Sequence, residues 1–178
     1  MSQNYNNLIT TVKALNDYNI KPVALAGTLL GLVRDSKLIE WDPDVDIGIV
    51  DGTWGEGCLA SAVDRMISKG FKIKRVLGGC KQISLVRNGY TVDLIKILRD
   101  EQGGYYNGVW YKVGIWPFRF RRMKRQYHDS WRGIEKSSQI PGLWIPVNVL
   151  SHLNDHYGPD WMTPRRDWHW MKDPRNIR

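Results

Sequence analysis

Hydrophobic and polar residues along the first hundred positions follow two different periods, which predicts a mixture of helices and strands. Two segments carry apolar residues at helical spacing and are predicted as amphipathic helices: residues 6–18 and residues 56–69, which Gly70 ends. Strands are expected where short runs are apolar, β-branched or alternating, namely residues 23–26, 44–50, 71–77, 81–87 and 90–98. The dipeptide Asn88-Gly89 favours a two-residue hairpin before the last strand. This order predicts an α/β (α+β) fold with a mixed sheet flanked by helices.

A strand, a tight turn and a short helix are predicted near the N-terminus. The pair Gly27-Thr28 interrupts an apolar run, and helical spacing resumes from Leu29 to Arg34. A turn at a helix N-terminus offers free backbone N–H groups and a positive dipole end to a phosphate, and glycine lets the backbone approach closely. Alone, this pair of residues is a weak signal. Its weight comes from the acidic strand that begins 16 residues after Thr28.

The second part of the chain has a less regular pattern. Residues 105–113 are predicted as another strand, and residues 148–157 as a helix that Gly158 ends. No linker rich in Pro, Gly or Ser separates the two parts of the chain. We therefore expect a single domain, with a catalytic core over about residues 1–104 and a C-terminal extension over about residues 105–178.

Charge and tryptophan are distributed unevenly over the chain. The 178 residues include 26 Lys and Arg against 18 Asp and Glu, a formal net charge of +8. Residues 1–100 hold 13 basic and 11 acidic side chains, whereas residues 101–178 hold 13 and 7, together with seven of the nine tryptophans. The run FRFRRMKR at residues 118–125 suits an anionic polymer, such as a charged glycan or a nucleic acid, as well as a plain solvated face.

Several protein classes are excluded by what the sequence lacks. No apolar run approaches the ~20 residues that span a bilayer, and the best one, residues 22–33, contains two glycines. The first residues, MSQNYNN, have neither the basic nor the apolar segment of a secretory signal. Two cysteines, Cys58 and Cys80, cannot build a disulfide framework. A reduced, cytoplasmic protein is the expectation.

The strongest chemical signal is the string WDPDVDIG at residues 41–48. Alternate side chains of a strand share a face, so Asp44 and Asp46 are expected to point the same way, about 7 Å apart. Such carboxylates repel each other unless a cation lies between them, and Mg²⁺ prefers oxygen ligands completed by phosphate oxygens. The alternative, a solvated acidic turn, is disfavoured because the following residues, Ile47 to Val50, read as a buried strand.

A third carboxylate, Asp93, lies in the otherwise apolar segment TVDLIKIL. An isolated buried charge would be costly there, so Asp93 either sits at an exposed edge or shares a cation with Asp44 and Asp46. Three converging carboxylates predict a phosphoryl-transfer site with two metal ions, Mg²⁺ or Mn²⁺.

These motifs together resemble the nucleotidyltransferase superfold, which has a Gly-Ser/Thr turn, then Asp-x-Asp, then an Asp on a later strand. Residues 26–48, AGTLLGLVRDSKLIEWDPDVDIG, are similar to the LicD/fukutin-related family, whose pattern runs Gly-Thr-Leu-Leu-Gly, Arg and Trp-Asp-x-Asp-hydrophobic-Asp. Residues 145–164 are similar to the closing segment of that family, with its Tyr-Gly and Asp-Trp-x-x-Pro. Residues 105–140 match poorly. Pro43 stands where the family often has Asp or another polar residue, which excludes a metal-shell role at that position.

The resemblance implies transfer of a phosphorylated small group from a CDP-activated donor, with release of CMP. Family donors carry choline phosphate or ribitol phosphate, and the acceptors are glycans or polyol-phosphate polymers. By position, Asp44 and Asp46 would hold the metals, and Asp93 would be a further ligand or the general base. Gly27 and Thr28 would hold the donor phosphates.

Two cations are weaker candidates for binding the donor phosphates. Arg34 ends the short helix, and Lys81 precedes Asp93 by one strand. For Arg34, an exposed cation at the favourable dipole end of the helix is an equally good interpretation. His152 and His156 stand four residues apart on a predicted helix, but no Glu follows His152 and no third ligand is evident, which disfavours zinc.

Two other functions stay open from the sequence. A nucleotidyltransferase that moves NMP from an NTP onto RNA, a protein or a small molecule would use the same three aspartates. A non-catalytic nucleic-acid-binding domain would use the basic charge and bind with a steep salt dependence, but the intact carboxylates disfavour it. The net charge indicates that the donor, the acceptor or both are anionic.

Overall fold

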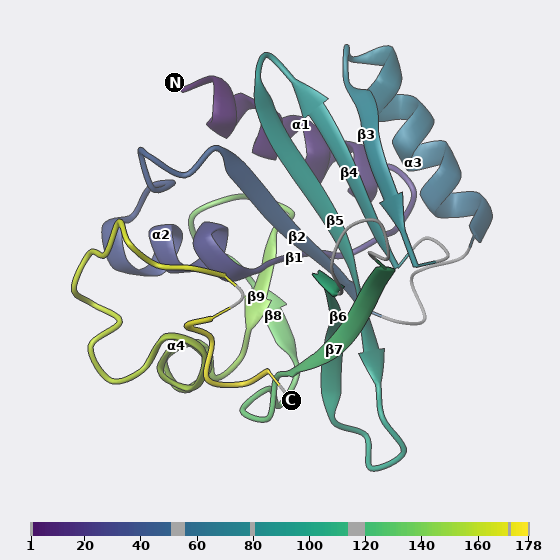
Figure 1. Ribbon diagram of the computed structural model, residues 1–178. Helices are drawn as coiled ribbons and strands as arrows, with labels where there is room; N and C mark the ends of the chain where they lie inside the picture. The colour runs from purple at the N-terminus through teal and green to yellow at the C-terminus, as the bar shows by residue number, and fades with distance from the viewer. Residues whose placement is uncertain (1, 51–55, 79–80, 114–119, 171, 178) are drawn as a thin grey trace.

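A mixed β-sheet forms the centre of the computed structural model, which describes residues 2–50, 56–78, 81–113, 120–170 and 172–177. Helices α1 (Gln3–Asn16) and α3 (Glu56–Ser68) pack together on one face of the sheet (Figure 1). The nine described strands are β1 (Pro22–Ala24), β2 (Asp44–Val50), β3 (Lys72–Leu77), β4 (Gln82–Arg87), β5 (Tyr90–Arg99), β6 (Tyr105–Val113), β7 (Phe120–Tyr127), β8 (Ile134–Lys136) and β9 (Trp144–Pro146). Their order is β3-β4-β5-β2-β1-β9-β8, with β6 and β7 attached through β5. The predicted α/β class and mixed sheet are confirmed.

The side chains of β2 alternate between two environments. Its odd-numbered residues are buried in the main core, with the helices: Val45, Ile47 and Ile49. Asp44 and Asp46 point to the opposite face and are partly buried. A smaller apolar cluster covers only part of that opposite face, and its buried members are Val23, Leu25, Ile97 and Trp131. The acidic end of β2 therefore lies on the face away from the principal core.

Helix α2 (Ala26–Asp35) begins three residues earlier than predicted. Gly27 and Thr28 belong to its first turn, whereas the sequence pattern places them in a separate turn before Leu29. The change from strand to helix occurs instead at Ala26, whose backbone φ of +42° is unusual for a residue with a side chain. A positive φ at alanine has no signal in sequence periodicity, which explains the misplaced helix start.

Other local predictions are confirmed with small shifts. Asn88 and Gly89 have φ of +54° and +82°, the two positive values expected of a type I′ hairpin turn. Gly70 follows α3 with a φ of +90°. Helix α1 starts at Gln3, ahead of the predicted residue 6, because the Ser2 hydroxyl caps it by accepting the Tyr5 N–H at 3.2 Å.

Residues beyond 104 add strands to the same sheet. Strand β6 pairs with the end of β5, and β9 pairs in parallel with β1. The sequence pattern does not predict β8 and β9, because strands of three residues are too short to show a period. Helix α4 (Val149–Tyr157) confirms the helix expected at 148–157.

The segment after α4 folds back over the molecule. It passes outside α2 and returns beside β7, where the chain ends (Figure 1). There the Tyr127 N–H donates to the Asn176 carbonyl at 2.9 Å, and Gln126 forms a bridge with Ile177. No helix in the described ranges has the length and apolar character needed to cross a bilayer.

Candidate active site

Three aspartates are brought together by the parallel pairing of β2 with β5. The register places Asp46 directly beside Asp93, and Asp44 beside Thr91. Paired residues of neighbouring strands point to the same face of a sheet, so the three carboxylates share one face. All three are partly buried. The structure thus brings Asp44, Asp46 and Asp93 together, while their chemical roles stay predictions.

Burial and mutual repulsion perturb these carboxylates. Burial raises the pKa of Asp46 well above its usual range, and the charges of Asp93, Asp42 and Asp44 raise it further. The pKa of Asp44 is raised by burial and by the charge of Asp93, whereas a hydrogen bond from Thr91 lowers it. One oxygen of Asp93, Oδ1, is buried without a hydrogen-bond partner in the described structure. Repelling acids with an orphaned oxygen are typical of a site that a cation completes.

The chemistry of these groups fits a hard divalent cation. Mg²⁺ and Mn²⁺ prefer oxygen ligands, and the three carboxylates supply them. Within the described ranges, no three His, Cys, Asp or Glu side chains are already grouped closely enough to hold a metal ion. Carboxylates that repel each other are expected to lie farther apart than carboxylates that share a cation. Binding would therefore require these side chains to close on the ion.

A fourth carboxylate, Asp42, packs against the N-terminal turn of α2. Its Oδ1 accepts the backbone N–H of Asp44 at 3.2 Å, and burial raises its pKa. A Cβ added to Gly27 would collide with its Oδ2. The close approach of this carboxylate therefore requires glycine at position 27.

We expect a Gly27→Ala variant to lose about tenfold or more in turnover, because the new methyl group displaces Asp42 from the carboxylate cluster. Circular dichroism should show a folded protein, and a product assay measures the loss. In an Asp42→Gly background the same alanine should have a much smaller effect, since the colliding group is gone. Equal effects in both backgrounds would contradict this explanation.

Thr28 is buried, with 1% of its surface exposed. Its hydroxyl accepts the backbone N–H of Asp46 at 2.9 Å and so connects the start of α2 to the central carboxylate of β2. The Thr28 side chain therefore contacts the backbone of Asp46, while the role of Gly27 and Thr28 in holding the donor phosphates stays a prediction.

The two candidate cations lie in different places. The Arg34 side chain is only 5% exposed and holds Asp35 through two hydrogen bonds of 2.7 and 2.8 Å, which raise the pKa of Arg34. It lines the cavity described below, so the expectation of an exposed helix-end cation is wrong. Lys81 precedes β4, where its carbonyl accepts the Lys96 N–H, and the structure does not bring it to that cavity.

The carboxylates open into a cavity of about 750 Å³, a size typical of small-molecule sites. Its walls come from the sheet, from α2, from β6 and β7, and from the segment after α4. Five tryptophans line it: Trp41, Trp110, Trp161, Trp168 and Trp170. Flat aromatic faces beside acidic groups suit a ligand that combines a base or sugar with phosphates.

Comparison with known proteins identifies the family. The domain described as LicD/FKTN/FKRP, nucleotidyltransferase domain, matches residues 19–155. The chain belongs to this family. It is also similar to proteins named ribitol-5-phosphate transferase FKTN, with 20% identity over 166 residues to those of Macaca fascicularis and Homo sapiens. The aligned region covers 93% of this chain but 34% of each relative, so the chain spans about a third of their length.

A distant likeness links this LicD-family chain to a solved structure. The solution structure of the antibiotic-resistance factor ANT(2'')-Ia matches 56% of this chain and 49% of its own, with 13% identity and a TM-score of 0.43. That likeness is too remote to inform the site.

Two cations of β3 approach the carboxylates of this LicD-family domain and were missed by sequence reasoning. The register of β3 with β4 shifts between Ile73 and Arg75, an irregularity of the β-bulge type. The charges of Lys74 and Arg75 both act to lower the pKa of Asp44, against its burial. Lys74 also donates to the Thr91 hydroxyl at 3.0 Å. Hydrophobic periodicity gives no signal for such a register shift. The two successive cations Lys74 and Arg75 in a short strand were the available hint that this strand contributes positive charge.

Tyr157, the last residue of α4, is a third residue that sequence reasoning missed. Burial raises its pKa strongly, the nearby charges of Asp46 and Asp42 add to this, and Arg34 opposes it. Its ring lies 4.7 Å from that of Trp168. The sequence signal that could have identified Tyr157 as a site residue was the Tyr-Gly pair of the family's closing segment.

Three of the four histidines, His128, His152 and His156, form a buried row beside this tyrosine. Ring centroids are 5.2 Å apart for His128 and His152, and 6.3 Å apart for His152 and His156. His128 pairs with the Asn107 side chain at 2.7 Å, and His156 with that of Asn176 at 3.0 Å. Burial lowers the pKa of His152 to about 3 and that of His156 to about 4. His128 and His156 are thus paired with side-chain amides, and the three imidazole rings pack the interior beside the site.

Proposed function

We propose that this member of the LicD/FKTN/FKRP family is a metal-dependent phosphotransferase. It moves a phosphorylated polyol or choline phosphate from a CDP-activated donor to an anionic glycan or polyol-phosphate acceptor. The observation that carries this proposal is the pairing of Asp46 with Asp93, beside Asp44, at the wall of a 750 Å³ cavity. Because the relatives are named ribitol-5-phosphate transferases, ribitol phosphate is the favoured group.

Each residue of the site has a proposed role that follows from its position. Asp44 and Asp46 would hold Mg²⁺ or Mn²⁺, with Asp93 as a further ligand or as the general base; the ion, when bound, neutralises phosphate charge and stabilises the charge that develops during transfer. The positive end of α2, at Gly27, attracts a donor phosphate. Arg75 lines the same cavity and adds a positive charge that acts on Asp44.

The bond changes follow from the donor's chemistry. The acceptor hydroxyl oxygen forms a bond to the phosphorus of the transferred group while the bond from that phosphorus to CMP breaks, so CMP leaves with the bonding pair. The hydroxyl proton goes to a carboxylate. Asp93 is the candidate, because its Oδ1 has no other described partner.

Product analysis tests this proposal. The purified chain is incubated with Mg²⁺ or Mn²⁺, a polyol-phosphate acceptor, and CDP-ribitol, CDP-choline or CTP in turn, and the products are identified by mass spectrometry. Release of CMP with ribitol phosphate or choline phosphate on the acceptor supports the proposal. CMP attached to the acceptor, with pyrophosphate released from CTP, establishes NMP transfer instead. Salt-dependent nucleic-acid binding with no turnover of any donor favours the non-catalytic alternative.

A further inference from the structure

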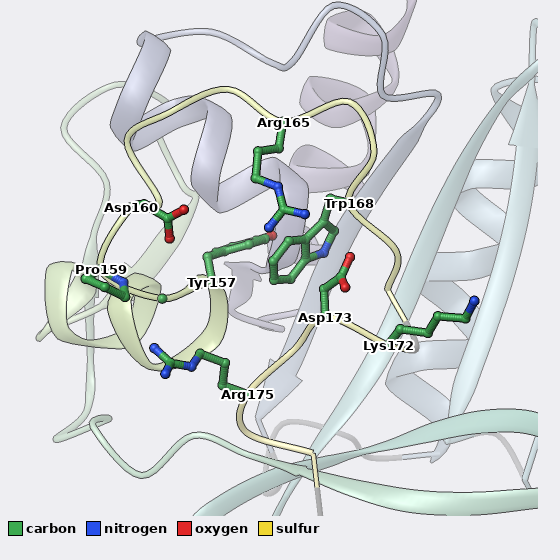
Figure 2. A pocket seen from close by; sticks show the side chains of 9 residues that line it. Tyr157, Pro159, Asp160, Arg165, Trp168, Lys172, Asp173 and Arg175 are labelled. Atoms are coloured by element: carbon green, nitrogen blue, oxygen red, sulfur yellow. The ribbon is translucent and has the colours of Figure 1, made fainter.

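A second cavity, of about 410 Å³, adjoins the first and is built by the segment that follows α4 (Figure 2). The two cavities share Tyr157 and Trp168, whose rings are 4.7 Å apart, as well as Asp160 and Arg165. Apart from Tyr157, every residue that lines the second cavity lies in residues 158–175, beyond the stretch that matches the family domain. The domain match ends at residue 155, so this cavity lies beyond it, although Tyr157, Gly158 and Asp160 belong to the segment that is similar to the family's closing motif.

Tyr157 and Trp168 form the partition between the two cavities. Tyr157 also lines the first cavity together with Asp42 and Asp46, and the charges of these two carboxylates raise its pKa. Figure 2 shows the two rings next to each other, with Arg165 above them and Asp173 below Trp168. A ligand in the second cavity thus lies next to the reaction site, with the Tyr157 ring between them.

Positive charge is available in this second cavity. The side chains of Lys172 and Arg175 make no hydrogen bond or ion pair with another described residue, and the backbone N–H of Arg175 is held by the His156 carbonyl at 3.2 Å. Arg165 is already engaged, since it pairs with Asp167 at 3.2 Å. An anion would therefore bind at Lys172 and Arg175.

Two carboxylates in the same cavity restrict which anion fits. Asp160 and Asp173 line it together with the cations, and both contribute negative charge near Arg165. A bare anion is repelled by these groups, whereas hydroxyl groups donate hydrogen bonds to them. The face of Trp168 completes a surface suited to the C–H groups of a polyol or sugar.

We propose that the second cavity binds the phosphorylated polyol end of the acceptor, with its phosphate at Lys172 and Arg175 and its hydroxyls at Asp160 and Asp173. The proposal rests on the proposed function, and it adds the place where the acceptor binds. An acceptor bound there presents a hydroxyl around Tyr157 to the carboxylate cluster. The segment after α4 then determines acceptor specificity.

Binding to the full chain tests the subsite without requiring turnover. Glycerol 3-phosphate serves as the probe in titration calorimetry, with wild type, a Lys172→Gln/Arg175→Gln variant and a control Arg132→Gln/Lys136→Gln variant. The control removes two exposed cations that line neither cavity. We expect at least about tenfold weaker binding in the first variant and unchanged binding in the control. Equal weakening in both variants, or no binding by wild type, would overturn the subsite.

A second comparison tests the role of the carboxylates. Wild type should bind glycerol 3-phosphate more tightly than inorganic phosphate. The Asp160→Asn variant should reduce that preference by about threefold or more, because a carboxylate accepts hydrogen bonds from hydroxyl groups better than an amide does. A preference for inorganic phosphate in wild type would overturn the assignment of a polyol.

Kinetics separate failure of the subsite from failure of the proposed function. With an active protein, the Lys172→Gln/Arg175→Gln variant should raise KM for the phosphorylated acceptor about tenfold and leave KM for the CDP donor unchanged. An unchanged acceptor KM refutes the subsite while the transferase function stands. If the wild-type protein turns over no CDP donor, but binds the probe and loses that binding in the variant, the subsite is supported and the transferase function is refuted.

Discussion

An Asp46→Asn variant is expected to lose at least about a thousandfold in turnover and, without divalent metal, to unfold at a higher temperature than wild type. The loss follows from removing the central carboxylate of the proposed cation site. The stabilisation follows from the raised pKa of Asp46. A carboxyl whose pKa is higher in the folded than in the unfolded state stabilises the fold only when protonated. Its ionised form is therefore a cost at neutral pH, which asparagine removes.

Thermal unfolding in EDTA and in Mn²⁺ measures both parts of this expectation. Mn²⁺ should raise the Tm of wild type, since an ion that binds only the folded state stabilises it, and should barely affect the variant. In EDTA the variant should gain roughly 2–4 °C for each kcal/mol of repulsion removed. Asp64→Asn, at an exposed position of α3, is the matched control and should change neither quantity. A variant that keeps metal-dependent turnover would refute the proposed site.

The carboxylate cluster could be anticipated because two local signals agreed. Alternation in β2 places Asp44 and Asp46 on one face, and the cost of burying an isolated charge leaves Asp93 either at an exposed edge or sharing a cation with them. Periodicity alone does not reveal that β2 and β5 are neighbours. The structure shows that Asp46 and Asp93 are paired in register.

The rest of the site depends on features that leave no periodic trace. The positive φ of Ala26 moves the start of α2 and turns the Thr28 hydroxyl toward the backbone of Asp46. The register shift in β3 brings Lys74 and Arg75 toward Asp44. Long-range packing decides each of these placements, and neighbouring residues in the sequence cannot encode it.

The C-terminal segment shows most clearly that sequence periodicity cannot predict which distant residues meet at the site. The described part of residues 158–177 contains no named helix or strand, yet it supplies the second cavity and part of the wall of the first. Composition singled out this region as basic and rich in tryptophan. Only the fold shows that Trp168 meets Tyr157 beside the carboxylates.

The free energy of unfolding is expected to fall steeply as the pH is lowered from about 6.5 toward 4. Burial holds the pKa of His152 at about 3 and that of His156 at about 4, against 6.5 for an ordinary histidine, and lowers that of His128 as well. A histidine with a lowered pKa stabilises the fold above its unfolded pKa, and this contribution is lost as the pH falls, because only the unfolded chain takes up the proton. Each histidine contributes a slope of roughly 1.4 kcal/mol per pH unit. Asp44 and Asp46, whose pKa values are raised, act in the opposite direction as they become protonated.

Urea unfolding at a series of pH values between 7.5 and 4.5 measures this slope. A His152→Leu variant removes one titrating group together with a buried Nδ1 that has no described hydrogen-bond partner, so its slope should be smaller by roughly 1.4 kcal/mol per pH unit. Ser151→Ala, which changes an exposed, non-titrating side chain of the same helix, is the matched control and should retain the wild-type slope. A stability that stays level from pH 6.5 to 4.5 in the wild-type protein would show that these imidazoles are not held neutral in the folded state.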